Sequence, residues 1–400
     1  MRFIAKFFIL GRIVCLFIGL GSITCSVVIA ASIQPPGVII DHVPATSGRY
    51  VGSPSIVTGT NGYYLASHDF FGPKSNEHQQ AVTAVFCSRD RGVSWQRIAI
   101  IDGQFWSSLF VNSGVVYLLG TDRHHGNVII RRSADGGKTW TTPLDNSTGL
   151  LRDDGEYHCA PTPVIEFRGR LWRGMERRKP AVGWGSNYCA GVLSAPISAD
   201  LLAATNWTFS NFLPSDRSWN KGDMRGWLEG NVVITPAGQI FDVLRVDTLK
   251  YPEKAALVSV SRDGEILSFD PATGFVNLPG GAKKFTIRYD PLSRSYWTLV
   301  NVVPPESETP ARPATIRNLL ALTTSKDLTN WTQRAVCFSH SDPVKHGFQY
   351  VDWQFEGDDI IAACRTASDD QDGGAHTYHD ANFLTFHRVK DFRNLSDRSK

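Results

Sequence analysis

The feature that most constrains this chain is a short motif that occurs twice, 45 residues apart. Ser88 to Trp95 and Ser133 to Trp140 both read Ser-x-Asp-x-Gly-x-Ser/Thr-Trp. In such a turn, called an Asp-box below, the Asp and Ser side chains bond backbone N–H groups, glycine takes a positive φ, and tryptophan packs between sheets. A spacing of this size suits one blade of a β-propeller. The motif therefore predicts an all-β propeller of four-stranded blades.

Degenerate copies of the motif extend the repeat along the chain. They occur at Ser194 to Trp207, Ser261 to Gly264, Ser325 to Trp331 and near Asp391-Phe392. Each copy follows a β-rich run. Very short turns precede them at residues 60–62, 112–114, 168–170, 236–238, 290–294 and 356–359. This pattern gives six blades, of which the last lacks an outer strand. We expect residues 37–41 to supply that strand and close the ring, which removes exposed sheet edges.

Residues 1–30 have the layout of a signal peptide. Arg2, Lys6 and Arg12 precede an uncharged apolar stretch that ends in small residues. We expect export to the periplasm, the medium or the cell surface, without stable membrane insertion after processing. A retained N-terminal anchor is the alternative. Residues 31–400 contain no second apolar span and no linker, so we expect a single β-propeller domain there.

Charge and cysteine content exclude several classes of protein. The net charge is +3, with lysines and arginines scattered among acids, so nucleic acid is not an expected partner. We expect a monomer.

Five of the seven cysteines follow the signal peptide. They could form one or two disulfides or remain buried free thiols, and the sequence leaves both alternatives open. Residues 376–380, with Cys337, His340 and His346, include ligand types suited to zinc. Their spacing is not diagnostic, so we expect polar loop residues, no metal and no cofactor.

One face of the propeller is expected to carry the chemistry. The Asp-box turns and short hairpins lie on one face, so the opposite face receives the long loops. Ten of the eleven histidines lie in or beside those loops. Binding groups concentrate on loops that a rigid scaffold carries. Arginines of this face suit an anionic sugar, because a guanidinium matches a carboxylate; they are Arg173, Arg177, Arg178, Arg225, Arg245 and Arg365.

The Asp-boxes resemble those of exo-sialidases. Those enzymes carry an Arg-Ile-Pro motif near the start, an arginine triad and a Tyr/Glu nucleophile pair. No Arg-Ile-Pro occurs in this sequence. The resemblance therefore implies the scaffold, and an exo-sialidase-like hydrolase is one alternative function.

A second resemblance covers nearly all of residues 31–400. Its motifs are Val38 to His42, Gly52 to Ser55, Ala66 to Pro73, Trp227 to Asn231, Phe348 to Trp353 and His379 to Asn382. They look like the propeller glycoside hydrolases that remove terminal L-rhamnose linked α-1,4 to glucuronic acid, and the related ulvan lyases. Members of this group are reported with seven blades, so seven blades are possible beside the six counted.

The rhamnosidase resemblance implies a catalytic histidine near the mature N-terminus, which here is His42. One imidazole would act as acid and then base, since no carboxylate pair of the ordinary glycosidase kind stands out. The leading hypothesis is an exported hydrolase that removes a terminal sugar, rhamnose on glucuronate, from acidic plant or algal glycans. Its partner would be an oligo- or polysaccharide with uronic acid.

The lyase resemblance implies a different set of residues. Ulvan lyases neutralise the uronate carboxylate with His or Arg and use a Tyr/His pair, for which the counterparts are His125, Tyr157 and Arg173. A second histidine is expected near residues 105–108, which read Phe-Trp-Ser-Ser. Tyr157 is the second catalytic candidate, and a non-catalytic glycan-binding propeller is a further alternative. The residues expected to bind substrate are His68, Asp69, His125, His158, Arg173, Arg245 and His379.

Overall fold

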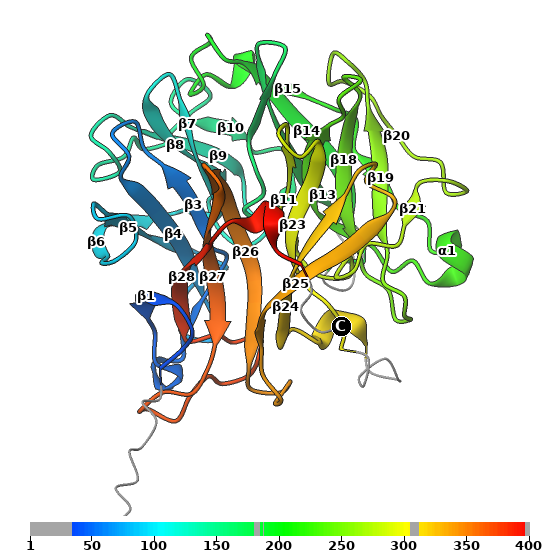
Figure 1. The fold of residues 1–400 in the computed structure, drawn as a ribbon. Helices are drawn as coiled ribbons and strands as arrows, with labels where there is room; N and C mark the ends of the chain where they lie inside the picture. The colour runs from blue at the N-terminus through cyan, green and yellow to red at the C-terminus, as the bar shows by residue number, and fades with distance from the viewer. Residues whose placement is uncertain (1–33, 180–184, 187, 305–311, 397–400) are drawn as a thin grey trace, which may run out of the picture. The chain divides into compact units, whose positions relative to one another are not determined.

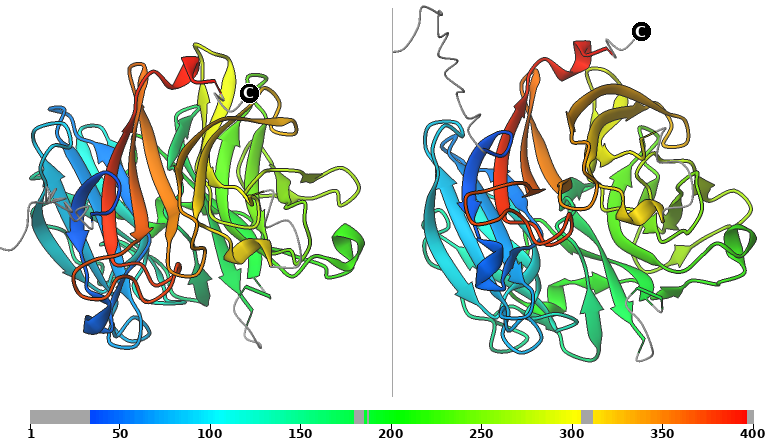
Figure 2. Two further views of the ribbon diagram at one scale, coloured as in Figure 1. Left: turned by 60° about the horizontal axis from the view of Figure 1, so that its bottom comes forward. Right: turned by 90° about the horizontal axis from the view of Figure 1, so that it is seen from below.

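The computed structural model describes residues 34–179, 185, 186, 188–304 and 312–396. Its contacts divide the chain into Met1–Ser32 and Ile33–Lys400, and the expected signal peptide at residues 1–30 lies outside the described residues. The second unit forms six antiparallel sheets, which are the blades of a propeller (Figure 1; Figure 2, right). The prediction of an all-β propeller is confirmed, and the number of blades is six.

The blades follow one another along the chain and run from the innermost strand outwards, except that the outer strand of blade 6 comes from the N-terminus. Blade 1 contains β2 (Tyr50–Val51), β3 (Ser55–Thr58), β4 (Tyr64–Phe71), β5 (Val82–Ser88) and β6 (Gln96–Asp102). Blade 2 contains β7 (Phe105–Asn112), β8 (Val115–Thr121), β9 (Val128–Ser133) and β10 (Leu150–Arg152). Blade 3 contains β11 (Glu156–His158), β12 (Ile165–Phe167), β13 (Arg170–Arg178), β14 (Tyr188–Pro196), β15 (Thr208–Phe209) and β16 (Leu213–Pro214).

The second half of the ring is built in the same way. Blade 4 contains β17 (Trp227–Ile234), β18 (Ile240–Val246), β19 (Ala255–Val260), β20 (Leu267–Ser268) and β21 (Phe275–Val276). Blade 5 contains β22 (Ile287–Asp290), β23 (Ser295–Asn301), β24 (Leu319–Ser325) and β25 (Trp331–Ser339). Blade 6 contains β26 (Gly347–Glu356), β27 (Asp359–Ala367), β28 (Phe383–Val389) and β1 (Val38–His42).

Helices are short and lie in the connections. Among the described residues they are α1 (Trp219–Gly222) and the 3-10 turns Ala45–Ser47, Ala204–Asn206, Pro313–Thr315 and Phe392–Asn394. Among the described residues, no helix has the length and apolar character needed to cross a bilayer.

The N-terminal strand closes the ring as expected. Strand β1 pairs antiparallel with β28, with Val38 opposite Phe386 and His42 opposite Phe383. It thereby becomes the outer strand that blade 6 otherwise lacks. Each of the six predicted short turns also joins the innermost strand of its blade to the next strand outwards.

The Asp-box turns have the hydrogen bonds that their sequence predicts. In the first copy, Ser88 Oγ accepts from Gly92 N at 2.8 Å, and Asp90 Oδ1 accepts from Ser94 N at 2.9 Å. The second copy repeats both bonds with Ser133 and Asp135 at 2.8 and 2.9 Å. Four side-chain oxygens therefore hold two turns in one conformation.

The glycines of three Asp-boxes pack against the preceding blade. Gly137 of blade 2 lies against Leu65 of blade 1, and Gly264 of blade 4 lies against Trp172 of blade 3. Gly92 of blade 1 lies against Phe386 of blade 6, across the point where the ring closes. The motif therefore joins neighbouring blades as well as shaping a turn.

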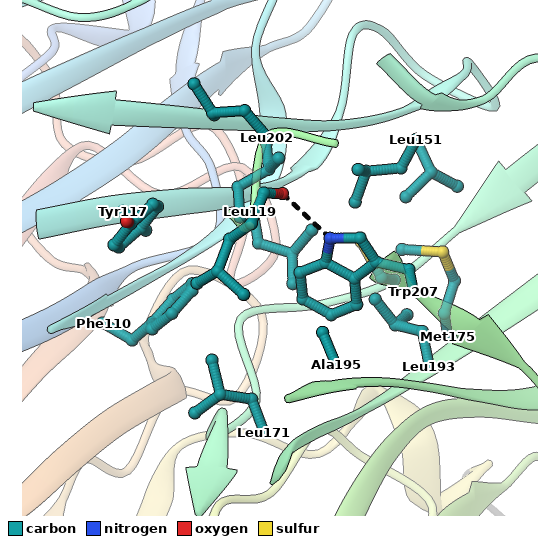
Figure 3. Close-up of a cluster of buried hydrophobic side chains, with 14 of the residues drawn as sticks. Phe110, Tyr117, Leu119, Leu151, Leu171, Met175, Leu193, Ala195, Leu202 and Trp207 are labelled. Atoms are coloured by element: carbon teal, nitrogen blue, oxygen red, sulfur yellow. Dashed lines mark hydrogen bonds between the residues drawn. The ribbon is translucent and has the colours of Figure 1, made fainter. Parts of the chain in front are cut away.

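The core consists of apolar side chains between adjacent blades. Between blades 2 and 3, Phe110 and Leu119 meet Leu171 and Leu193, and Trp207 inserts among them (Figure 3). The Trp207 indole N–H donates to the carbonyl oxygen of Leu201 at 2.9 Å. Burial of this tryptophan therefore leaves no polar atom unpaired.

The cysteines of the described residues are all free thiols. Cys87, Cys159, Cys189 and Cys364 are buried, and Cys337 is half-buried. Of the two alternatives that the sequence leaves open, the structure has free thiols.

Two glycine substitutions test the packing of the first Asp-box. Gly92 and Gly62 both have positive φ, 91° and 74°, so alanine at either position costs about 1–2 kcal/mol of backbone strain. A Cβ on Gly92 would also lie 2.1 Å from the Phe386 ring, whereas a Cβ on Gly62 meets nothing within 4 Å. We expect Gly92→Ala to lower the free energy of unfolding by at least about 1 kcal/mol more than Gly62→Ala. Urea titration of both variants measures the difference, and equal losses would contradict the packing role.

Candidate active site

A cavity of about 600 Å³ opens at the centre of the long-loop face. Its wall contains residues from all six blades, including Ser53, Trp106, His158, Glu229 and Tyr350. The loop that carries Glu77 enters β5, and the first Asp-box leaves β5 at its other end. The cavity therefore lies opposite the Asp-box turns, on the face where the sequence predicts the site.

A β-bulge in three innermost strands directs side chains into the cavity. Trp106 of β7, Glu229 of β17 and Tyr350 of β26 have φ values of 48°, 55° and 55°. Each lies where the register of its strand shifts against the next strand. Such a bulge adds an unpaired residue and re-aims its side chain. All three residues line the cavity.

The bulges of blades 4 and 6 bring a tyrosine onto a carboxylate. Tyr350 Oη donates to Glu229 Oε1 at 2.9 Å, and Arg245 Nη1 donates to Glu229 Oε2 at 2.9 Å. Burial by itself would raise the pKa of Glu229, but the charge of Arg245 and both hydrogen bonds lower it below its usual value. Glu229 is therefore an ionised carboxylate positioned to take the proton of Tyr350.

Two further arginines face the cavity from blades 5 and 6. Their guanidinium carbons lie 5.4 Å (Arg317) and 5.0 Å (Arg365) from the centre of the Tyr350 ring. Both are buried, and within the described residues neither forms an ion pair with a carboxylate. Burial, with the positive charge of Arg317, lowers the pKa of Arg365 to about 10. A buried unpaired cation is unfavourable, so this side of the cavity suits an anion.

A buried carboxyl group lies on the blade 1 side of the cavity. Asp69 Oδ2 accepts from the backbone N–H of Trp106 at 2.7 Å, and its other oxygen accepts from Ser53 N. Burial raises the pKa of Asp69 above its usual value, and these backbone bonds offset only part of the rise. Asp69 can therefore keep a proton at a pH where an ordinary aspartate has lost it.

Four of the predicted site residues line the cavity. They are Asp69, His158, Arg245 and His379. His158 Nδ1 lies 2.7 Å from Glu176 Oε2, and His379 Nδ1 lies 2.8 Å from Asp380 Oδ1.

The other five predicted residues lie outside the cavity wall. His42, at the end of the outer strand β1, bonds Asp370 at 2.9 Å and stacks on Phe383. Tyr157 donates to Asp154, and buried His68 bonds Asp41. Arg173 is fully buried and donates to the carbonyl oxygen of Ala160. His125 lies beside Tyr188, and burial lowers its pKa to about 2.

The sequence analysis did not find the Tyr350–Glu229 pair or the role of Arg317. The two members of the pair are separated by 121 residues and belong to different blades. A weak signal exists, because Glu229 is the one charged residue in its innermost strand. Nothing in the sequence identifies its partner.

Blade 4 contains a buried aspartate without a hydrogen-bond partner among the described residues. Asp242 of β18 is fully buried, and neither of its carboxyl oxygens is bonded. Gly174 and Gly230 leave room for it, since a Cβ on either would come within 2.8 Å of its oxygens. Burial, then the negative charge of Glu176, raises the pKa of Asp242 well above its usual value. This carboxyl group is therefore protonated in the folded protein at pH values where it ionises in the unfolded chain.

Comparison with known proteins supports the fold. No protein-family model and no curated protein sequence matches the chain. Among solved structures, a Hadza microbial sialidase matches with a TM-score of 0.62 and 13% identity over 88% of this chain and 68% of that one.

Two further structures match over most of this chain. An α-L-arabinanase of Penicillium chrysogenum, complexed with arabinobiose, has a TM-score of 0.55 and 13% identity over 90% of this chain and 98% of that one. A sialidase of Trypanosoma rangeli, in complex with sialic acid, has a TM-score of 0.55 and 16% identity over 90% and 60%. The chain is a six-bladed propeller structurally like these glycan-cleaving enzymes.

The raised pKa of Asp242 predicts a pH-dependent gain in stability from Asp242→Asn. Above about pH 3.9 the unfolded chain releases a proton that the folded protein keeps, so the aspartate destabilises the fold increasingly as pH rises. We expect Asp242→Asn to raise the melting temperature at pH 7 by about 2 °C or more, and to have little effect near pH 4. Asp290, whose pKa is lowered overall because its bonds to Arg393 and Ser293 outweigh burial, is the matched control. Asp290→Asn should instead destabilise the protein at pH 7. If Asp242→Asn raised the melting temperature equally at pH 4 and pH 7, the raised pKa of Asp242 would be contradicted.

Proposed function

We propose that this protein is an exo-acting, retaining glycosidase that removes a terminal sugar with a carboxylate group from a glycan. The observation that carries the proposal is the hydrogen bond of Tyr350 to ionised Glu229 in a cavity that also contains Arg245, Arg317 and Arg365. The structural likeness to glycan-cleaving propellers supports the reaction class.

Tyr350 has the surroundings of a nucleophile. A phenol is a weak nucleophile until a base removes its proton, and in the resting geometry Glu229 accepts a hydrogen bond from the Tyr350 hydroxyl and so stands ready as that base. A neutral tyrosine also avoids the repulsion that a carboxylate nucleophile would meet near the carboxylate of the sugar.

Asp69 has the properties of the acid and base. In the first step the Tyr350 oxygen attacks the anomeric carbon, its proton passes to Glu229, and Asp69 protonates the departing glycosidic oxygen. In the second step Asp69 takes a proton from water, and the resulting hydroxyl attacks the anomeric carbon. The tyrosine oxygen leaves and recovers its proton from Glu229. Two displacements retain the anomeric configuration.

The arginines supply specificity for an acid. Arg317 and Arg365 bring two guanidinium groups to the Tyr350 side of the cavity, and each can donate a pair of hydrogen bonds to a carboxylate. The cavity volume is within the range of small-ligand sites, which suits one terminal sugar. We propose a sialic-acid-type sugar as the first substrate class, with uronate-bearing glycans as the second.

The rhamnosidase hypothesis stays a prediction and takes second place. It depends on His42, which bonds Asp370 outside the cavity wall. The lyase alternative needs Tyr157 as a base, but burial and the bond to Asp154 raise the pKa of Tyr157 above its usual value. This makes deprotonation of Tyr157 harder. Export through residues 1–30 and action as a monomer remain proposals of the sequence analysis.

Removal of the Tyr350 hydroxyl tests the proposal. We expect Tyr350→Phe to lower turnover of a fluorogenic α-sialoside by roughly 10³-fold or more, because the nucleophile is lost. Tyr289→Phe, at a half-buried tyrosine outside the cavity wall, should keep wild-type turnover. His42→Ala should also keep wild-type turnover. The rhamnosidase hypothesis predicts the opposite result, in which His42→Ala loses rhamnose release and Tyr350→Phe keeps it. Unchanged turnover in a folded Tyr350→Phe protein would contradict the proposal.

The shifted carboxyl groups predict an acidic, bell-shaped pH profile of kcat/KM. Activity should rise as Glu229 ionises, below the usual glutamate pKa of about 4.3. It should fall as Asp69 loses its proton, above the usual aspartate pKa of about 3.9. An aryl leaving group needs little protonation, so Asp69→Asn should keep measurable first-step activity and lose the falling limb. A falling limb that persists unchanged in Asp69→Asn would assign it to another group.

A further inference from the structure

A cluster of two histidines and a glutamate lies on the wall of the cavity between blades 1 and 2. Glu77 and His78 belong to the loop between β4 and β5, and His124 belongs to the loop between β8 and β9. His124 Nδ1 lies 3.2 Å from Glu77 Oε1, and His78 Nε2 lies 3.5 Å from the same oxygen. The three ligand atoms all lie within 4.8 Å of one another. The mechanism proposed above uses none of these residues.

The distances within the cluster are longer than those of most other His–carboxylate contacts in this protein. The shorter contacts are 2.7–2.9 Å long; they are His42–Asp370, His68–Asp41, His158–Glu176, His376–Asp380 and His379–Asp380. His346 also makes long contacts, 3.5 and 3.6 Å, but to two separate carboxylates. Among the described residues, Glu77 Oε1 is the only carboxylate oxygen that has two histidine nitrogens near it, at 3.2 and 3.5 Å. Zinc bonds of about 2.0–2.1 Å place neighbouring ligand atoms of a tetrahedron about 3.3–3.4 Å apart, which is the spacing found around Glu77.

The surroundings hold the glutamate in a fixed orientation. Glu77 Oε2 accepts from Gly72 N at 2.9 Å and from Ser75 Oγ at 3.1 Å, so Oε1 is the oxygen left for the histidines. The backbone N–H of His124 also donates to the carbonyl oxygen of Glu77 at 2.8 Å, which joins the two loops. Outer hydrogen bonds of this kind orient metal ligands.

We propose that Glu77, His78 and His124 bind a divalent transition-metal ion, zinc by preference, at the wall of the central cavity. Two histidines and a glutamate are a known ligand set for zinc sites that keep one position open. Glu77 and His124 line the cavity, so the open position faces the space where substrate binds. There it would take a water molecule or an oxygen of the glycan. The inference does not depend on the role of Tyr350, because it concerns a separate set of side chains.

Zinc titration of the full chain, first stripped with a chelator, tests the inference. We expect one Zn²⁺ per chain, measured by competition with a chromophoric chelator. His78→Ala and His124→Ala should each weaken binding by more than the roughly 10–100-fold that loss of an outer-shell partner costs. The His78 side chain is 71% exposed, so its removal should leave the fold intact. Melting curves of the variants check this.

Two matched variants separate this site from ordinary surface histidines. His376→Ala and His42→Ala each remove a histidine bonded to a carboxylate elsewhere, and both should keep wild-type zinc affinity. Mg²⁺ and Ca²⁺ prefer oxygen ligands and should not displace Zn²⁺. Absence of stoichiometric binding, or equal affinity in wild type and a folded His78→Ala protein, would overturn the inference. If Tyr350→Phe lost activity but bound zinc as the wild type does, the proposed zinc site would still be supported.

Discussion

The cavity depends on a backbone feature, the β-bulge with a left-handed residue in the innermost strands of blades 2, 4 and 6. Successive side chains of a regular strand point to opposite faces of its sheet, where adjacent blades cover them. A bulge releases one residue from this alternation, and in this protein those residues are Trp106, Glu229 and Tyr350. A left-handed non-glycine residue costs roughly 1–3 kcal/mol and persists only where its surroundings hold it. The packed ring of blades provides those surroundings, so the fold and the site are energetically connected.

The charges around the bulges give the cavity its chemical character. Glu229 is ionised because Arg245 and Tyr350 bond both of its oxygens. Arg317 and Arg365 are buried without a carboxylate partner among the described residues. Two positive groups therefore stand beside a tyrosine whose proton has an acceptor. Such an arrangement favours a negatively charged ligand over a positively charged one. It also favours a neutral nucleophile over a carboxylate.

The same scaffold occurs in proteins with very different sequences. Identities of 13–16% accompany TM-scores of 0.55–0.62 with sialidases and an arabinanase. The frame depends on Asp-box turns, short hairpins and apolar contacts between blades, which many sequences can supply. The chemistry depends on a few side chains at the loops and bulges, and it has to be inferred from those side chains. The Glu77, His78 and His124 cluster is one set that the fold alone would not predict.

The sequence by itself determined the repeating frame of this protein. The Asp-box motif and the six short turns are local patterns, and they produce their structures through hydrogen bonds between residues close in sequence. The closing strand at residues 37–41 was predicted because the last blade lacks an outer strand, and its partner β28 lies at the other end of the chain. The sequence also placed Asp69, His158, Arg245 and His379 on the face that carries the cavity, because the lengths of the connections distinguish the two ends of the strands. Only the tertiary structure decided that Tyr350 meets Glu229, and that His42 and Tyr157 lie outside the cavity wall. That pairing joins residues 121 positions apart, and it follows from the closure of six blades and from bulges whose positions no local pattern encodes.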